Sequence, residues 1–142
     1  MTDQLAPYDS DPPAPGLRSM SWMVDKFDVS ARALRFYEYK GLISPLRDGV
    51  RRRFTPADVD RLREILRLKS CGATLDEIYA LQQVRVAGEP AAIRAAERAL
   101  AETLAPRARQ RFADASAQLD ALGEWRGELG LSARAGQSGE AA

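Results

Sequence analysis

The chain has 142 residues, of which 45% are hydrophobic and 29% are charged, and its formal net charge is +1 at pH 7. This length accommodates one compact domain with an extension, and the hydrophobic content is that of a globular protein. With one cysteine and no histidine, the chain excludes an intramolecular disulfide and offers little for metal binding or proton transfer. No segment approaches the ~20 apolar residues of a membrane span, and the first residues lack the order of a secretory signal, so we expect a cytoplasmic protein.

Two ends of low apolar content flank the part of the chain that we expect to fold. Residues 1–17 contain four prolines and three aspartates, a composition that cannot bury enough apolar surface to fold alone. Residues 131–142 are mostly small and polar. The sequence therefore predicts a disordered arm at residues 1–17 and a disordered tail at residues 131–142.

The segment from Ser30 to Gly41 has the pattern of a short helix with a clear start and stop. Ser30 is a good N-cap, because its hydroxyl can accept a hydrogen bond from a free backbone N–H of the first turn. Gly41 tolerates the left-handed conformation that ends many helices. We expect a helix over residues 31–40, with Arg32 and Arg35 away from its apolar contacts. Exposed arginines at this spacing suit contacts with phosphates and base edges.

A short hairpin is expected after this helix, because Asp48 and Gly49 form a turn signal between two short flanks. Residues 32–53 contain seven basic and two acidic residues, a local balance of +5 in a chain whose net charge is +1. Such a cluster on a helix and a hairpin is typical of a protein that neutralises DNA phosphates. A solvated basic face without a partner is the alternative.

Two further helices follow the hairpin in the sequence. Thr55 can cap the first of them, with Pro56 at its first helical position and Asp58 in its first turn. After Gly72, Thr74 can cap a shorter helix. We expect the apolar faces of both helices to form core.

A long alanine-rich helix is expected from Pro90 onward. Large apolar residues recur in it at helical spacings, and a single helix cannot bury such a stripe against a domain that is already complete. We therefore expect an antiparallel coiled-coil homodimer over residues 89–130, with an interface formed by Ile93, Leu100, Leu104, Phe112, Leu119 and Leu122. Pro106 removes a backbone hydrogen bond at a cost of ~3 kcal/mol, which predicts a kink, or a break near residues 103–105.

Residues 18–84 resemble the N-terminal domain of the MerR family of bacterial transcription regulators. The motifs that carry the resemblance are Asp28-Val29-Ser30, Arg32-Ala33-Leu34-Arg35-Phe36-Tyr37-Glu38 with Gly41-Leu42, Arg51-Arg52-Arg53-Phe54, and Gly72-Ala73-Thr74-Leu75-Asp76-Glu77-Ile78. The resemblance implies a mainly α fold, with a winged helix-turn-helix DNA-binding domain and its small β-hairpin wing at residues 18–85. A dimerisation helix is expected to follow this domain.

The resemblance also implies which residues contact DNA. In this family the basic residues of the recognition helix, the second aromatic residue of that helix, a wing arginine and a residue just before the conserved glycine touch the DNA backbone. Position by position, they correspond to Arg32, Arg35, Tyr37, Arg52 and Lys69. Arg51 stands where the family has a wing tyrosine, and Arg53 adds a further positive charge. We therefore expect the wing to bind phosphate through its charge, and we predict that Arg51 and Arg53 also contact DNA. Ala73 stands where the family has a phenylalanine, a loss of a few kcal/mol of burial.

The sequence favours a sequence-specific transcription regulator that binds a palindromic promoter site as a homodimer and alters transcription by distorting the DNA, with RNA polymerase as a further partner. An architectural or excisionase-like DNA binder and a helical protein-interaction module are the alternatives. We do not expect an enzyme, because paired carboxylates, a nucleophile with a base and a phosphate loop are missing at usable spacings. No cofactor or metal is expected, because no cysteine follows Cys71. Whether the protein binds a small-molecule effector, and which one, stays an open question.

Overall fold

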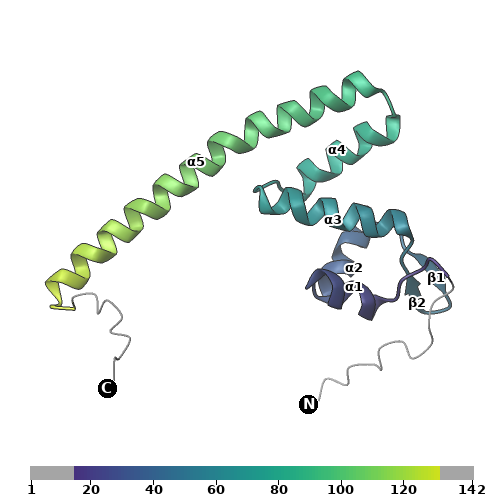
Figure 1. The fold of residues 1–142 in the computed structure, drawn as a ribbon, viewed down its shortest axis with the longest axis horizontal. Helices are drawn as coiled ribbons and strands as arrows, with labels where there is room; N and C mark the ends of the chain where they lie inside the picture. The colour runs from purple at the N-terminus through teal and green to yellow at the C-terminus, as the bar shows by residue number, and fades with distance from the viewer. Residues whose placement is uncertain (1–14, 132–142) are drawn as a thin grey trace, which may run out of the picture. The chain divides into compact units, whose positions relative to one another are not determined.

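The computed structural model describes residues 15–131. Within them the elements follow in the order α1 (Met20–Phe27), α2 (Ala31–Tyr39), β1 (Leu46–Asp48), β2 (Arg51–Arg53), α3 (Pro56–Ser70), α4 (Leu75–Ala87) and α5 (Pro90–Glu128), as Figure 1 shows. The expected mainly α fold with a hairpin wing and a long C-terminal helix is confirmed. The expected disordered arm and tail fall almost entirely outside the described residues.

The helices begin at the caps that the sequence indicates. The Ser30 hydroxyl accepts a hydrogen bond from a backbone N–H of the first turn of α2. Thr55 and Thr74 each form a capping box with the acidic residue three positions later, at the starts of α3 and α4. Gly41 has a φ of 74°, in the left-handed region, just after the C-cap of α2. Cys71 is the C-cap of α3 and is exposed.

The core of the N-terminal part gathers side chains from the five helices, from the loops between them and from Phe54, the residue after the wing. Its buried members are Met23, Leu34, Tyr37, Leu42, Ile43, Phe54, Val59, Leu62, Ile65, Ala73, Ile78 and Leu104. Ile78 is fully buried, so α4 packs firmly although Ala73 is small. Trp22 and Phe27 are half-buried at its edge with their rings 6.3 Å apart.

The hairpin is attached to the start of the described chain. Arg18 and Phe54 exchange two backbone hydrogen bonds of 2.8 Å, which form an isolated antiparallel bridge beside β2. Asp58, at the start of α3, is 1% exposed and accepts a hydrogen bond from the backbone N–H of Ser44, in the loop between α2 and β1. The wing is therefore held at both of its ends by contacts with other segments.

The first part of α5 packs with the preceding helices. One compact unit extends to Leu104 and a second unit begins at Ala105. Arg85 of α4 forms an ion pair with Glu64 of α3 and donates a 2.6 Å hydrogen bond to Glu97 of α5. Burial lowers the pKa of Arg85, but hydrogen bonds to the two carboxylates raise it more, so its pKa lies above its ordinary value.

Of the two outcomes expected at Pro106, the break is wrong, because α5 is one helix from Pro90 to Glu128 with Pro106 inside it, and the kink stays a prediction. Proline removes a single backbone hydrogen bond and adds a local clash. Alanine, which is frequent on both sides of Pro106, has the highest intrinsic helix propensity of all residues, and this favours continuation of the helix. None of the helices between residues 15 and 131 is long and apolar enough to cross a membrane.

Candidate nucleic-acid interface

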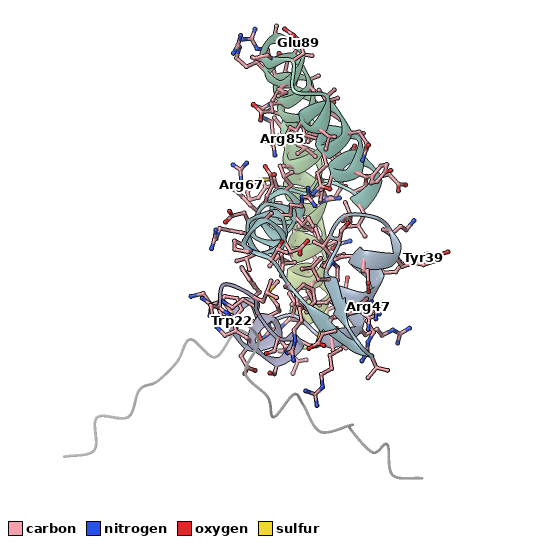
Figure 2. All side chains as sticks on the ribbon, turned by 90° about the vertical axis from the view of Figure 1, so that its right-hand side faces the viewer. Trp22, Tyr39, Arg47, Arg67, Arg85 and Glu89 are labelled. Atoms are coloured by element: carbon pink, nitrogen blue, oxygen red, sulfur yellow. The ribbon has the colours of Figure 1, made fainter. Side chains whose placement is uncertain are left out.

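The outward face of α2 carries four exposed side chains at positions i, i+3, i+4 and i+7, which are Arg32, Arg35, Phe36 and Tyr39. The inward face buries Leu34 and Tyr37 in the core. This division follows from the helical period, which places residues three and four apart on one face. Tyr39 is 83% exposed, and Figure 2 shows it pointing outward. Within residues 15–131, the Arg32 and Arg35 guanidinium groups have no ion-pair partner.

The wing is a two-stranded antiparallel hairpin in which Arg47 pairs with Arg52 and Asp48 with Arg51. Gly49, with a φ of 60°, and Val50 form its two-residue loop. A glycine at the first loop position is typical of a type II′ turn, whose twist matches that of the strands. The turn that the sequence predicts is therefore present, with Asp48 as the last residue of β1.

The three wing arginines lie in different environments. The Arg52 Nε donates a 2.5 Å hydrogen bond to Glu38 of α2, and the Arg52 side chain is 21% exposed. The Arg53 side chain is only 5% exposed, with its Nε 3.6 Å from Asp48 Oδ2. Arg51 is half-buried. Of the three arginines, Arg53 therefore points into the protein rather than toward its surface, and its side chain is poorly placed to contact DNA.

Tyr37 and Lys69, which the sequence suggested separately, come together where α2 meets α3. The Lys69 Nζ donates a 3.0 Å hydrogen bond to the Tyr37 hydroxyl and lies 5.4 Å from the centre of its ring. The ring itself is buried and Lys69 is exposed. Tyr37 therefore acts first as core, and Lys69 offers the charge of the pair to the surface.

The main residues that sequence reasoning missed are Glu38 and Arg47. Arg47 Nη2 donates a 2.9 Å hydrogen bond to Glu38 Oε1, and Arg52 binds the other carboxylate oxygen. The signal that the sequence offered was an acidic residue, Glu38, within a basic segment. The arginines that bind it lie 9 and 14 residues away in the sequence, so the pairing could not be read from a local pattern. Sequence reasoning also assigned no site role to Phe36 and Tyr39, whose side chains are exposed on the outward face of α2.

The candidate dimer residues divide into two groups. Leu104 is 7% exposed in the core of its own chain, and Ile93 and Leu100 are half-buried, because the first part of α5 packs against the preceding helices. Phe112, Leu119 and Leu122 are exposed, as is Trp125. The apolar surface that is left for a partner therefore lies in the second half of α5. Among residues 15–131, no cluster of acidic or cysteine side chains could hold a metal ion.

Comparison with known proteins agrees with this geometry. The model of the MerR HTH family regulatory proteins matches residues 18–84. The chain is similar to the crystal structure of HiNmlR, described as a MerR family regulator lacking the sensor domain, bound to promoter DNA; the identity is 26% and the TM-score 0.59, over 80% of this chain and 91% of that one. A MerR family transcriptional regulator from Bacillus cereus shares the fold, with 20% identity and a TM-score of 0.59 over 89% of this chain and 87% of its own. No curated protein matches significantly.

Proposed function

Because residues 18–84 match the model of the MerR HTH family regulatory proteins, we propose that the chain is a homodimeric transcription regulator that binds a palindromic promoter site. The observation that carries the proposal is the outward face of α2, where Arg32, Arg35, Phe36 and Tyr39 stand in one exposed stripe beside the wing. An α-helix fits the major groove of B-DNA. The promoter DNA in the HiNmlR structure supports the same class of ligand.

The side chains of this stripe suit different parts of a duplex. Arginine can bind guanine through two hydrogen bonds or neutralise a phosphate, and an aromatic ring can contact a thymine methyl group. We assign Arg32 and Arg35 to the groove and its edges, and Arg51, Arg52 and Lys69 to the phosphates on either side. The Tyr37 hydroxyl positions Lys69 in this assignment.

The homodimer is supported by the exposed apolar side chains Phe112, Leu119 and Leu122 in the second half of α5. An antiparallel pair of such helices relates two protomers by a twofold axis, so the two α2 helices would meet an inverted repeat. Bending or untwisting of the duplex between the half-sites is the expected route to changed transcription by RNA polymerase in the cytoplasm. The proposal requires no catalytic residue.

Selection of bound duplexes from a random pool by the full chain tests this proposal. Convergence on an inverted repeat, with two protomers per duplex by sedimentation, is expected. A pool that converges on one unrepeated half-site bound by one protomer would refute the dimeric regulator.

Arginine variants of the full chain then test the assignment of the surface. Arg35→Ala should lower affinity for the selected duplex by roughly 1–3 kcal/mol, because one base-edge contact in the groove is lost. Arg109→Ala is the matched control, because Arg109 is exposed on α5 outside this surface. Equal effects of the two substitutions would remove Arg35 from the site.

A further inference from the structure

Glu38 is the only acidic residue of α2, and its carboxylate joins this helix to both strands of the wing. Oε1 accepts a hydrogen bond of 2.9 Å from Arg47 Nη2 of β1, and Oε2 accepts one of 2.5 Å from Arg52 Nε of β2. Arg47 and Arg52 are directly opposite each other in the hairpin. A rotation of the wing against α2 would therefore lengthen at least one of the two contacts.

The environment makes these contacts stronger than ordinary surface ion pairs. The side chains of Glu38 and Arg52 are each 21% exposed, whereas that of Arg47 is 50% exposed. Partial burial reduces screening by water and salt, and hydrogen bonds between charged groups are short and strong. The orientation of Arg52 in particular is fixed before any partner arrives.

The same two guanidinium groups are candidates for contact with phosphates. A guanidinium has five N–H donors, so an arginine that binds Glu38 through one or two of them can still offer the others to a phosphate. It can do so only from the direction that Glu38 imposes. A duplex that presents its phosphates elsewhere would have to draw the arginine away from the carboxylate, and the negative charge of Glu38 itself opposes the approach of the backbone.

We infer that Glu38 is a positioning residue that makes the wing selective: it holds Arg47 and Arg52 for the phosphates of the specific site and limits their use on other DNA. This inference rests on the DNA binding proposed above. Its physical basis is that non-specific affinity comes almost entirely from neutralised phosphates and released counterions. Restricting two arginines therefore lowers non-specific affinity more than specific affinity.

The substitution Glu38→Gln tests the inference, because glutamine keeps the shape of the side chain and one acceptor oxygen but loses the charge. Affinity for a scrambled duplex should rise, and its salt slope should steepen by roughly 0.9 for each arginine released. Affinity for the selected operator should stay equal or fall. The ratio of the two affinities should thus decrease by on the order of tenfold at physiological salt.

Asp60→Asn is the matched control, because it removes the same charge from an exposed residue of α3 that pairs with Arg63. Titrations of the full chain with operator and scrambled duplexes at four salt concentrations compare the wild type with both variants. A steeper non-specific slope in Glu38→Gln alone supports the inference. An unchanged slope, or the same change in Asp60→Asn, would overturn it, since total charge would then explain the result.

Two further variants complete the experiment. Arg47→Ala in the Glu38→Gln background should remove about one unit of the gained slope, as a double-mutant cycle requires if the two residues act together. Glu38→Asp, whose shorter side chain cannot reach both arginines, should give the same direction of change if the glutamine variant does not fold. A wild type that binds operator and scrambled duplexes equally would refute the proposed function itself, whereas normal wild-type selectivity with a null Glu38→Gln effect would refute only this inference.

Discussion

Asp58→Ala should be among the most damaging single substitutions outside the apolar core. The Asp58 carboxylate is 1% exposed and accepts three hydrogen bonds: one of 3.0 Å from the backbone N–H of Ser44, and two of 2.9 Å from the backbone N–H and the hydroxyl of Thr55. It thereby closes the capping box of α3 and fixes the loop that leads from α2 into the wing. Its removal affects both the helix start and the loop.

The expected cost follows from these contacts. Loss of the Asp58 half of the capping box, which accepts from the backbone N–H and the hydroxyl of Thr55, costs about 1 kcal/mol. A partly buried N–H of Ser44 that is left without a partner costs a further ~1–3 kcal/mol, because its hydration is not restored. We therefore expect Asp58→Ala to lower the free energy of unfolding by about 3 kcal/mol, and Asp58→Asn by about half as much, since the amide retains one acceptor oxygen.

Urea unfolding at a fixed protein concentration, followed by circular dichroism and tryptophan fluorescence, measures this cost. Asp60→Ala is the control: Asp60 lies two residues away on the same helix, its side chain is 74% exposed, and its one ion pair within residues 15–131 is with Arg63. That substitution should cost less than about 0.5 kcal/mol, as exposed ion pairs do. A loss below about 1 kcal/mol for Asp58→Ala would show that the buried carboxylate does not hold the loop and helix together.

Three other substitutions probe separate parts of the molecule. Leu119→Asp should convert dimers into monomers by sedimentation equilibrium, because an unpaired carboxylate in an apolar interface costs several kcal/mol; a variant that dimerises like the wild type would place the interface elsewhere. Arg85→Ala should lower the free energy of unfolding by about 1 kcal/mol. Because the pKa of Arg85 is raised, this contribution is lost only at a pH above the ordinary arginine pKa, and the cost should be the same at about pH 6 and about pH 9. Gly49→Ala should destabilise the wing by roughly 1–2 kcal/mol in urea unfolding, because φ is positive there although the space for a Cβ is open; an unchanged midpoint would contradict the type II′ turn.

The parts of the fold that could be predicted from the sequence are those set by local chemistry. Ser30, Thr55 and Thr74 each cap a helix by accepting a hydrogen bond from a backbone N–H three residues away, so the helix starts can be predicted from the local sequence. The hairpin turn is equally local, since Gly49 alone supplies the positive φ that the loop needs. These elements required no knowledge of the rest of the chain.

The remainder depends on contacts between distant residues. Lys69 reaches the Tyr37 hydroxyl across 32 residues, and Glu38 reaches Arg52 across 14, so no spacing rule connects them. Arg53 and Arg52 are adjacent in the sequence, yet strand alternation sends their side chains to opposite faces, and only the register decides which one is buried. Leu104 was expected to face another chain because the extent of the core was not visible from the helical pattern.

The bridge between Arg18 and Phe54 has a consequence for how the domain is assembled. Its two hydrogen bonds join residues 36 positions apart, whereas most contacts within the helices span only a few residues. Closing such a long loop costs conformational entropy that local helix formation does not. We therefore expect α3 and α4 to form before the bridge that attaches the wing. In hydrogen exchange, the amides of Arg18 and Phe54 should open together, as one unit that is less protected than the centre of α3. The wing part of the surface proposed to meet DNA would then be the last to form and the first to open.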